Sequence, residues 1–202
     1  MNQITGVIIT LNEANNIEEC ITSLQTVCNE VIVVDSGSQD NTREIADACG
    51  AKVFIQPYLG DGPQKNYGLQ FASNDWILSL DADERLTPEL IRDINQLSLT
   101  DTLYDGFAMR RRNYIGSRWI KRCGWYPDYC VRLYNRQKTR FKEVKQHSFV
   151  DAISPKKLNS DLIHYSFKNL GELFAKQGRN FSPRSATIMY QKGGRAAALS
   201  RD

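Results

Sequence analysis

A chain of 202 residues, 41% hydrophobic and 24% charged, has the composition of an ordinary globular domain. It holds no run of roughly 18 apolar residues, which argues against a membrane-spanning helix, and no basic-then-apolar leader, which argues against a secretory signal. Five cysteines without a CxxC pair argue against zinc and thioredoxin-like sites and favour idle thiols in a reducing cytoplasm.

The net charge of +3 conceals an asymmetry between the two halves of the chain. Residues 1–100 hold 5 basic and 15 acidic residues, whereas residues 101–202 hold 21 and 8. An acidic half can attract a metal ion, and a basic half can attract phosphate or anionic lipid. Partial neutralisation of one half by the other is the structural alternative.

The first half alternates strand and helix signals. Continuous apolar runs predict strands, and apolar residues three and four apart, such as Ile17, Ile21 and Leu24, predict a helix. Pro88 suits the first turn of another helix. The expected strands are 4–10, 30–35, 52–56 and 76–80, and the expected helices are 15–24, one from about 42, 60–72 and 88–97. Four strands separated by helices predict a Rossmann-like, mostly parallel sheet flanked by helices.

The second half changes character, since its strand-like segments have no regular helices between them. The expected strands are 106–115, 129–134, 141–150 and 156–166, followed by a helix over 170–177 and a frayed tail over 191–202. We therefore expect an α/β fold in which residues 1–100 bind one ligand, and residues 101–202, a mixed-strand C-terminal extension of the same domain, bind a second one.

Acidic residues and one asparagine follow several of the predicted strands. In open α/β sheets, ligands bind beyond the carboxyl ends of the strands, so these side chains should share one pocket. They are Asn12 and Glu13 after the first strand, Asp35 at the end of the second, and Asp81, Asp83 and Glu84 after the fourth.

The triplet Asp81-Ala82-Asp83 points to a divalent cation. In extended backbone its two carboxylates would point to opposite sides, so that one could face a metal and the other could reach it through water or hold a sugar hydroxyl. Oxygen ligands without a nearby cysteine suit Mg²⁺ or Mn²⁺. A solvated loop that caps the next helix is the structural alternative. Asp35 could accept hydrogen bonds from a base or a ribose, or could simply form a turn.

Four motifs in this order resemble family 2 glycosyltransferases with the GT-A fold: "VIITLNEANNIEECITSL", "EVIVVDSGSQDNT", "GPQKNYGL" and "WILSLDADE". The later segments "GWYPDYCVRLYNR", "HSFV" and "LIHYSFKNLGELFAKQGR" resemble the lipopolysaccharide-core glucosyltransferase type. The resemblance implies transfer of a sugar from a nucleotide donor, such as UDP-glucose, to a core-oligosaccharide or other glycan or lipid-linked acceptor. It also implies a cytoplasmic enzyme, with peripheral contact to the inner membrane.

The resemblance assigns roles to individual residues. Uracil and ribose would be held by Thr10, Leu11, Asn12, Glu13 and Asp35. Lys65 would approach the diphosphate with Asn66 beside it, Asp81 next to Ala82 would contact the ribose or a metal-bound water, and Asp83 would ligate the metal. Asp128 aligns with the motif that carries the catalytic base of inverting members.

Two departures from the family pattern stand out. Relatives tend to carry His-Glu where this chain has His147 and Ser148, so any role of that glutamate is absent or filled by another residue. Relatives also continue into further helices beyond the last residues of this chain, which suggests a truncated or short member.

The chemistry of glycosyl transfer agrees with these roles. A divalent ion and Lys65 could stabilise the leaving diphosphate, and a carboxylate can take the proton of the acceptor hydroxyl. Asp128 lies among aromatic residues that would shield it from water, although a turn aspartate paired with Arg132 is the alternative. The candidates for holding the acceptor are Trp125, Tyr126 and Arg132.

The sequence also allows other interpretations of these features. The basic stretch 110–122 could bind phosphates on the acceptor, could pass for an RNA-binding patch, or could be a solvated face. His164 could join the metal or be structural. A nucleotidyltransferase would normally carry a glycine-rich, basic loop after the first strand, where this chain has "TLNEANN". We expect no nucleic acid partner.

Overall fold

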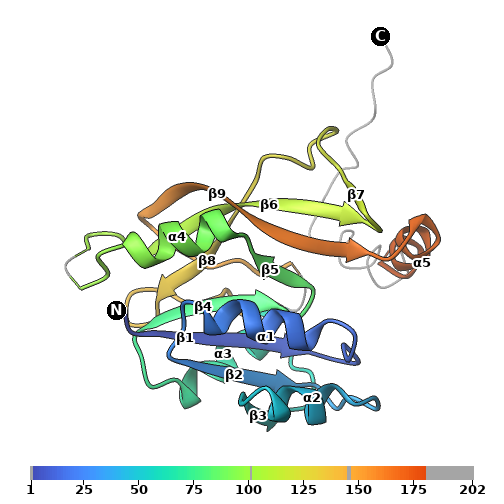
Figure 1. The fold of residues 1–202 in the computed structure, drawn as a ribbon, viewed down its shortest axis with the longest axis horizontal. Coiled ribbons are helices and arrows are strands. Elements are labelled where there is room, and N and C mark those ends of the chain that lie inside the picture. Colours follow the sequence, from blue (N-terminus) through green and yellow to red (C-terminus); the bar gives the residue numbers. More distant parts are fainter. Residues whose placement is uncertain (1, 101, 145–146, 181–202) are drawn as a thin grey trace, which may run out of the picture.

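A computed structural model describes residues 2–100, 102–144 and 147–180, with only the backbone of 176–180. Within these residues nine strands form one sheet in the order β3-β2-β1-β4-β8-β6-β9-β5, with β7 paired to β6 (Figure 1). The strands are β1 Ile4–Thr10, β2 Glu30–Asp35, β3 Lys52–Ile55, β4 Trp76–Asp81, β5 Glu84–Leu86, β6 Gly106–Ile115, β7 Arg118–Trp119, β8 Asp128–Asn135 and β9 Pro155–Phe167.

The first four strands are parallel, as predicted. The chain passes between them through α1 (Ile17–Gln25), α2 (Thr42–Ala48) and α3 (Asp61–Gly68), the last followed by the short 3-10 helix η1 (Leu69–Phe71). The expected helix over 60–72 is therefore split in two. Helix α4 (Pro88–Gln96) follows β5, and α5 (Leu170–Asn180) follows β9. None of the described helices combines the length and hydropathy that crossing a membrane requires.

The second half extends the sheet with mixed strands, as expected. Strand β8 is antiparallel to both β4 and β6, β6 is parallel to β9, and β9 is antiparallel to β5. Only Ala82 and Asp83 separate β4 from β5 in the chain, yet β5 lies at the far end of the strand order. The sheet must therefore curl so that β9 and β5 return to the end of β4.

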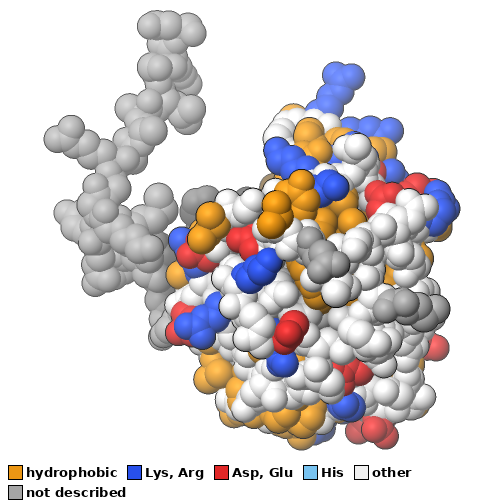
Figure 2. Space-filling model, turned by 90° about the vertical axis from the view of Figure 1, so that its left-hand side faces the viewer, with side chains coloured by type: hydrophobic (Ala, Val, Ile, Leu, Met, Phe, Trp, Pro, Cys, Tyr) orange, Lys and Arg blue, Asp and Glu red, His pale blue; other side chains and the backbone are white. Residues whose placement is uncertain are grey.

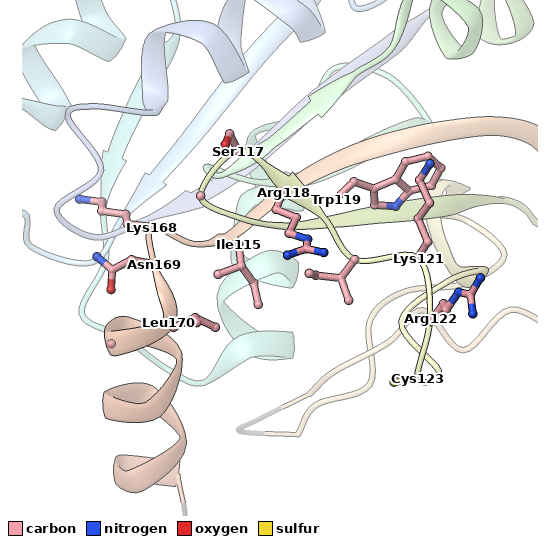
Figure 3. Close-up of a pocket in the computed structure, with 13 residues that line it drawn as sticks. Ile115, Ser117, Arg118, Trp119, Lys121, Arg122, Cys123, Lys168, Asn169 and Leu170 are labelled. Carbon is pink, nitrogen blue, oxygen red and sulfur yellow. The ribbon is translucent and has the colours of Figure 1, made fainter.

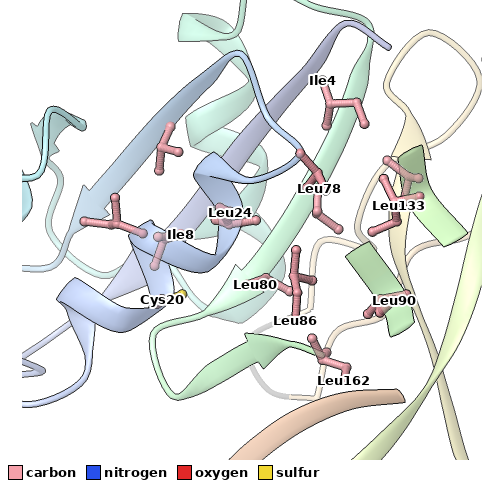
Figure 4. Packing of buried hydrophobic residues seen from close by; sticks show 14 of the residues in the cluster. Ile4, Ile8, Cys20, Leu24, Leu78, Leu80, Leu86, Leu90, Leu133 and Leu162 are labelled. Carbon is pink, nitrogen blue, oxygen red and sulfur yellow. The ribbon is translucent and has the colours of Figure 1, made fainter. Parts of the chain in front are cut away.

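Alternation along the strands separates two cores. Ile8 and Leu78 face the larger one, where α1 and α4 cover the sheet with residues such as Leu24 and Leu90 (Figure 4). Val7 and Ile77, one position away, face the smaller one beside η1 on the other side of the sheet. Burial on both faces explains why β1, β2 and β4 are continuous apolar runs.

The prediction of a strand over residues 141–150 was wrong. Phe141 and Val150 form one isolated antiparallel bridge, and the described residues between them belong to a loop. The loop packs on α3, since the Ser148 amide donates to Asp61 Oδ2 and the Gly62 amide donates to the Val144 carbonyl. Of the residues described in this segment, only the two apolar ends are buried, so these residues lack the alternating face of a strand. The tail expected over 191–202 lies outside the described residues.

Candidate active site

A cavity of about 290 Å³ lies where β1, β2 and β4 end. Parallel strands bring their carboxyl ends to one edge of a sheet, which is where ligands of α/β proteins bind. The lining residues are Ile9, Thr10, Leu11, Glu13, Ser36, Tyr58, Asp81, Ala82 and Asp83. Six predicted site residues are among them: Thr10, Leu11, Glu13, Asp81, Ala82 and Asp83.

The carboxylate of Asp81 is already paired with two cations. Its Oδ1 lies 3.0 Å from Lys65 Nζ and its Oδ2 lies 2.8 Å from Arg132 Nη2, and both cations are buried. Burial alone would raise the pKa of Asp81, but Lys65 and Arg132 outweigh it and hold that pKa well below its usual value. Asp81 is therefore ionised, and it shares its two cations with Asp61 and Glu84.

Asp83 points away from these cations toward His164. The register of β5 and β9 sets Glu84 opposite His164, which places His164 Nε2 3.4 Å from Asp83 Oδ2. Both side chains are partly exposed, at 22% and 18%. Carboxylate oxygen and imidazole nitrogen together suit Mn²⁺, and an oxygen-rich set with phosphate suits Mg²⁺.

The fit of a metal ion depends on what else it would bind. The described residues contain no cluster of three or more His, Cys, Asp or Glu side chains that could enclose an ion. Asp83 and His164 would thus supply two ligands and leave open positions for phosphate oxygens and water. This pair fits a metal that is shared with a diphosphate better than it fits a closed structural site.

Asp128 lies in a second cavity of about 550 Å³, which shares Asp81 with the first. Its Oδ2 accepts hydrogen bonds from Arg111 Nε at 2.9 Å and Arg111 Nη2 at 2.7 Å. Among the described residues, Oδ1 has no hydrogen-bond partner. The alternative role for Asp128 was a turn aspartate paired with Arg132. In the structure Asp128 is paired with Arg111 instead. Arg132 is paired with Glu84, at 2.5 Å, and with Asp81.

Three residues predicted to bind the nucleotide lie elsewhere. Asp35 is fully buried and accepts hydrogen bonds from the Gly37 and Ser38 amides and from Ser38 Oγ, so Ser36 lines the cavity in its place. Asn12 Oδ1 accepts from the Gln39 amide, and Asn66 is bonded through both side-chain atoms to the backbone of Phe141. Asp35 thus bonds its own turn, as short polar side chains at strand ends readily do, whereas Asn12 and Asn66 bond segments 27 and 75 residues away.

The three candidates for holding the acceptor differ in exposure. Tyr126 donates its hydroxyl to Asp161 Oδ1 at 3.0 Å, and Trp125 contacts Phe167 edge to face. Both are partly exposed beside Asp128 in sequence. Arg132 is buried behind Asp81 and Glu84, so it is placed to hold these two carboxylates in position.

Another cavity, of about 940 Å³, lies between the segment after β7 and the start of α5 (Figure 3). None of the predicted site residues lines it. Arg118, Lys121, Arg122 and Lys168 line it without any acidic residue, and Lys121 lies over the Trp119 ring. On the opposite end of the molecule, basic and acidic side chains are interspersed (Figure 2).

The basic stretch 110–122 is thus divided by the fold. Arg110 and Arg112 both pair with the buried Asp161, and Arg111 pairs with Asp128. Only Arg118, Lys121 and Arg122 remain on the cavity beside α5.

Two kinds of site residue were not predicted from the sequence. Ser36 and Tyr58 follow β2 and β3, so the strand-end rule that selected Asp81 could have found them. Arg111 was hidden in a basic stretch, and nothing in the sequence shows which arginine meets Asp128.

Comparison with known proteins identifies the family. The sequence profile of glycosyl transferase family 2 matches residues 5–160. An uncharacterized glycosyltransferase of Rickettsia bellii is 36% identical over 186 residues, which cover 86% of this chain and 63% of that protein. The lipopolysaccharide core biosynthesis glycosyltransferase LpsC of Rhizobium meliloti is 32% identical over 117 residues, covering 55% of this chain and 43% of that protein.

Among solved structures, S. aureus TarS 1-349 matches with a TM-score of 0.62 at 17% identity, covering 82% of this chain and 61% of TarS 1-349. TarS 1-349 has also been crystallised with UDP and with UDP-GlcNAc. The likeness confirms the expected GT-A fold, and the chain spans under two thirds of both the R. bellii relative and TarS 1-349. The family match favours a glycosyltransferase over a nucleotidyltransferase or an RNA-binding protein. The chain belongs to glycosyl transferase family 2.

Proposed function

We propose that this chain carries the donor site and the catalytic base of a metal-dependent, inverting glycosyltransferase. The observation that supports this most directly is the meeting of two cavities at Asp81. One cavity is lined by Asp83, whose Oδ2 lies 3.4 Å from His164 Nε2, and the other is lined by Asp128 with its unpaired Oδ1. A donor in the first cavity and an acceptor in the second would meet beside Asp81.

On the donor side, Asp83 and His164 would hold Mg²⁺ or Mn²⁺. When bound, such an ion would neutralise charge on the leaving nucleoside diphosphate. Lys65, which lies between Asp61 and Asp81 at 2.8 and 3.0 Å, keeps Asp81 ionised and in place. Thr10, Leu11 and Tyr58 form the wall against which the nucleoside would lie.

On the acceptor side, Asp128 would act as the general base. The acceptor oxygen forms a bond to the anomeric carbon as the bond from that carbon to the diphosphate breaks, and the hydroxyl proton moves to Asp128 Oδ1. We propose a single displacement, and therefore inversion, because in this scheme no second carboxylate serves as nucleophile: Asp81 is tied by Lys65 and Arg132.

The substrates are proposed from the relatives. TarS, crystallised with UDP and UDP-GlcNAc, makes a UDP-sugar the first donor class to test. The partial match to LpsC supports a lipopolysaccharide-core or related glycan as the acceptor. The cytoplasmic face of the inner membrane is the location that we propose for the transfer. The cations beside α5 are the part of the basic stretch that remains available for phosphates on such an acceptor.

The test combines binding with turnover. We expect calorimetry to show Mn²⁺ and UDP binding that Asp83→Ala and His164→Ala weaken, and a panel of UDP-sugars to reveal hydrolysis of at least one donor. Asp128→Asn should keep Mn²⁺ and UDP binding but lower transfer about 10²- to 10⁴-fold, since it removes only the base. Asp75→Asn, an exposed carboxylate at the far end of β4, is the control and should change neither. Absence of both UDP binding and donor hydrolysis would refute the proposal.

A further inference from the structure

Asn113 of β6 lies between the two halves of the proposed site. It is buried, at 6% exposure. Its Oδ1 lies 2.7 Å from His164 Nδ1, and its Nδ2 lies 3.3 Å from the Trp125 carbonyl and 3.5 Å from Asp128 Oδ2. One amide therefore contacts both the histidine that faces Asp83 and the carboxylate proposed as the base.

Strand register explains this position. Asn113 is paired with His164 on β9, and Arg111 is paired with Asp128 on β8. Residues two apart on a strand share a face, so Arg111 and Asn113 both reach Asp128 from β6. Both bond to Oδ2, which leaves Oδ1 unpaired.

The neighbours of Asn113 decide which way its amide faces. A backbone carbonyl and a carboxylate can only accept hydrogen bonds, so the Nδ2 donor must face Trp125 and Asp128. Oδ1 then faces His164, and the ring must donate from Nδ1. The neutral imidazole consequently keeps its lone pair on Nε2, the atom 3.4 Å from Asp83 Oδ2. Ser166 Oγ lies 3.0 Å from His164 Nδ1 and 3.3 Å from Asn113 Oδ1. Because Nδ1 carries the proton that it donates to Asn113, the hydroxyl directs its own proton to Oδ1.

We propose that Asn113 is a positioning residue that serves both halves of the site through its two amide atoms. Its oxygen holds His164 in the tautomer that presents Nε2 to a divalent cation, and its nitrogen holds Asp128 by Oδ2 so that Oδ1 is free for the acceptor. The effect on metal binding and transfer rests on the proposed function, whereas the tautomer of His164 does not.

The tautomer of His164 can be measured directly. His147 and His164 are the only histidines, and His147 is exposed, so two ring systems give a simple side-chain ¹⁵N spectrum with an internal reference. We expect Nδ1 of His164 to carry a proton in the metal-free protein, because it faces the Asn113 oxygen at 2.7 Å. Protonation at Nε2 instead would overturn the proposal, even if no variant of Asn113 folds.

Two substitutions of Asn113 distinguish the role of its amide oxygen from that of its amide nitrogen. Asn113→Ala removes both, so His164 should become a mixture of tautomers and Mn²⁺ affinity should fall about 10- to 100-fold. Asn113→Asp keeps an oxygen for Nδ1–H but replaces the donor with a carboxylate beside Asp128. It should keep the tautomer and the Mn²⁺ affinity, while kcat for transfer falls and the KM for the donor stays unchanged.

The outcomes distinguish the inference from the proposed function. If Asn113→Ala leaves both the tautomer and Mn²⁺ affinity unchanged, or if Asn113→Asp loses the tautomer as Asn113→Ala does, the inference is wrong. A wild-type protein with the expected tautomer but without Mn²⁺ binding contradicts the proposed function and leaves the tautomer assignment supported. Thermal unfolding of each variant shows that it is folded.

Discussion

At the scale of single residues, Glu30 at the start of β2 gives the clearest pH dependence. Its carboxylate accepts from Thr5 Oγ1 at 2.7 Å, Lys52 Nζ at 2.8 Å and the Ser73 amide at 2.6 Å. Partial burial would raise the pKa of Glu30, but the hydrogen bonds from Lys52, Thr5 and Ser73 outweigh it and lower the pKa to about 2.

Because the folded-state pKa lies below the unfolded value of 4.5, Glu30 stabilises the protein above that value, and the contribution is lost as the pH falls toward 2. Glu30→Gln should therefore lower the free energy of unfolding at pH 7 and have a shrinking effect between about pH 5 and pH 2. Urea unfolding at several pH values measures this. The exposed Glu44→Gln is the control, expected within about 0.5 kcal/mol of the wild type; an effect of Glu30→Gln that grows on acidification would contradict the argument.

Single residues also show how much of the site could be predicted from the sequence. Asp81 and Asp83 were predictable because an apolar strand ends directly in them, and the strand-end rule also placed Glu13 at the same cavity. Their partners were not predictable, since Arg132 lies 51 residues from Asp81 and His164 reaches Asp83 only through the curl of the sheet. The partner of Asn66 was not predictable either, because its amide bonds to the backbone of Phe141, 75 residues along the chain.

At the scale of elements, the start of α4 joins two parts of the chain through one hydroxyl. Thr87 Oγ1 accepts from the Leu90 amide at 3.2 Å and donates to the Asp161 carbonyl on β9 at 2.7 Å, and the residue is buried. Thr87→Ala should cost about 1–2 kcal/mol, since it removes a helix cap and leaves a buried carbonyl unpaired.

The matched control is Thr87→Ser, which retains the hydroxyl and should recover most of the lost free energy of unfolding in urea titrations. If Thr87→Ser and Thr87→Ala are equally destabilised, the hydroxyl is not what stabilises the junction, and the methyl group must carry the effect.

Elements with a strong local signal were predictable. The buried strands β1, β2 and β4 are continuous apolar runs, and Pro88 marks the start of α4. The short strands β5 and β7 were missed because three and two residues carry no periodicity of their own. They exist because β9 and β6 offer them partners, so tertiary pairing decides their conformation.

At the scale of the whole molecule, the acidic and basic halves share one sheet. Strand β4 of the first half pairs with β8 of the second, and β5 pairs with β9. The larger core likewise combines Leu78 and Leu80 with Leu133 and Leu162 (Figure 4). The alternation of strands and helices predicted the parallel half, but the return of β5 to β9 depends on long-range pairing that no local pattern records.

A substitution of Leu78 tests whether the two halves of the chain unfold as one unit. Leu78 is fully buried in β4, opposite Gly6 on β1 and Leu133 on β8, so it lies where the two halves join. Leu78→Ala should lower the free energy of unfolding by about 2–5 kcal/mol. Because the halves share one core, amide hydrogen exchange should accelerate by the same factor in β1 and in β6. The exposed Leu103→Ala, at 93% exposure, should stay within about 0.5 kcal/mol of the wild type. Acceleration confined to β1 would show that the two halves unfold separately and that the join at β4 and β8 is weak.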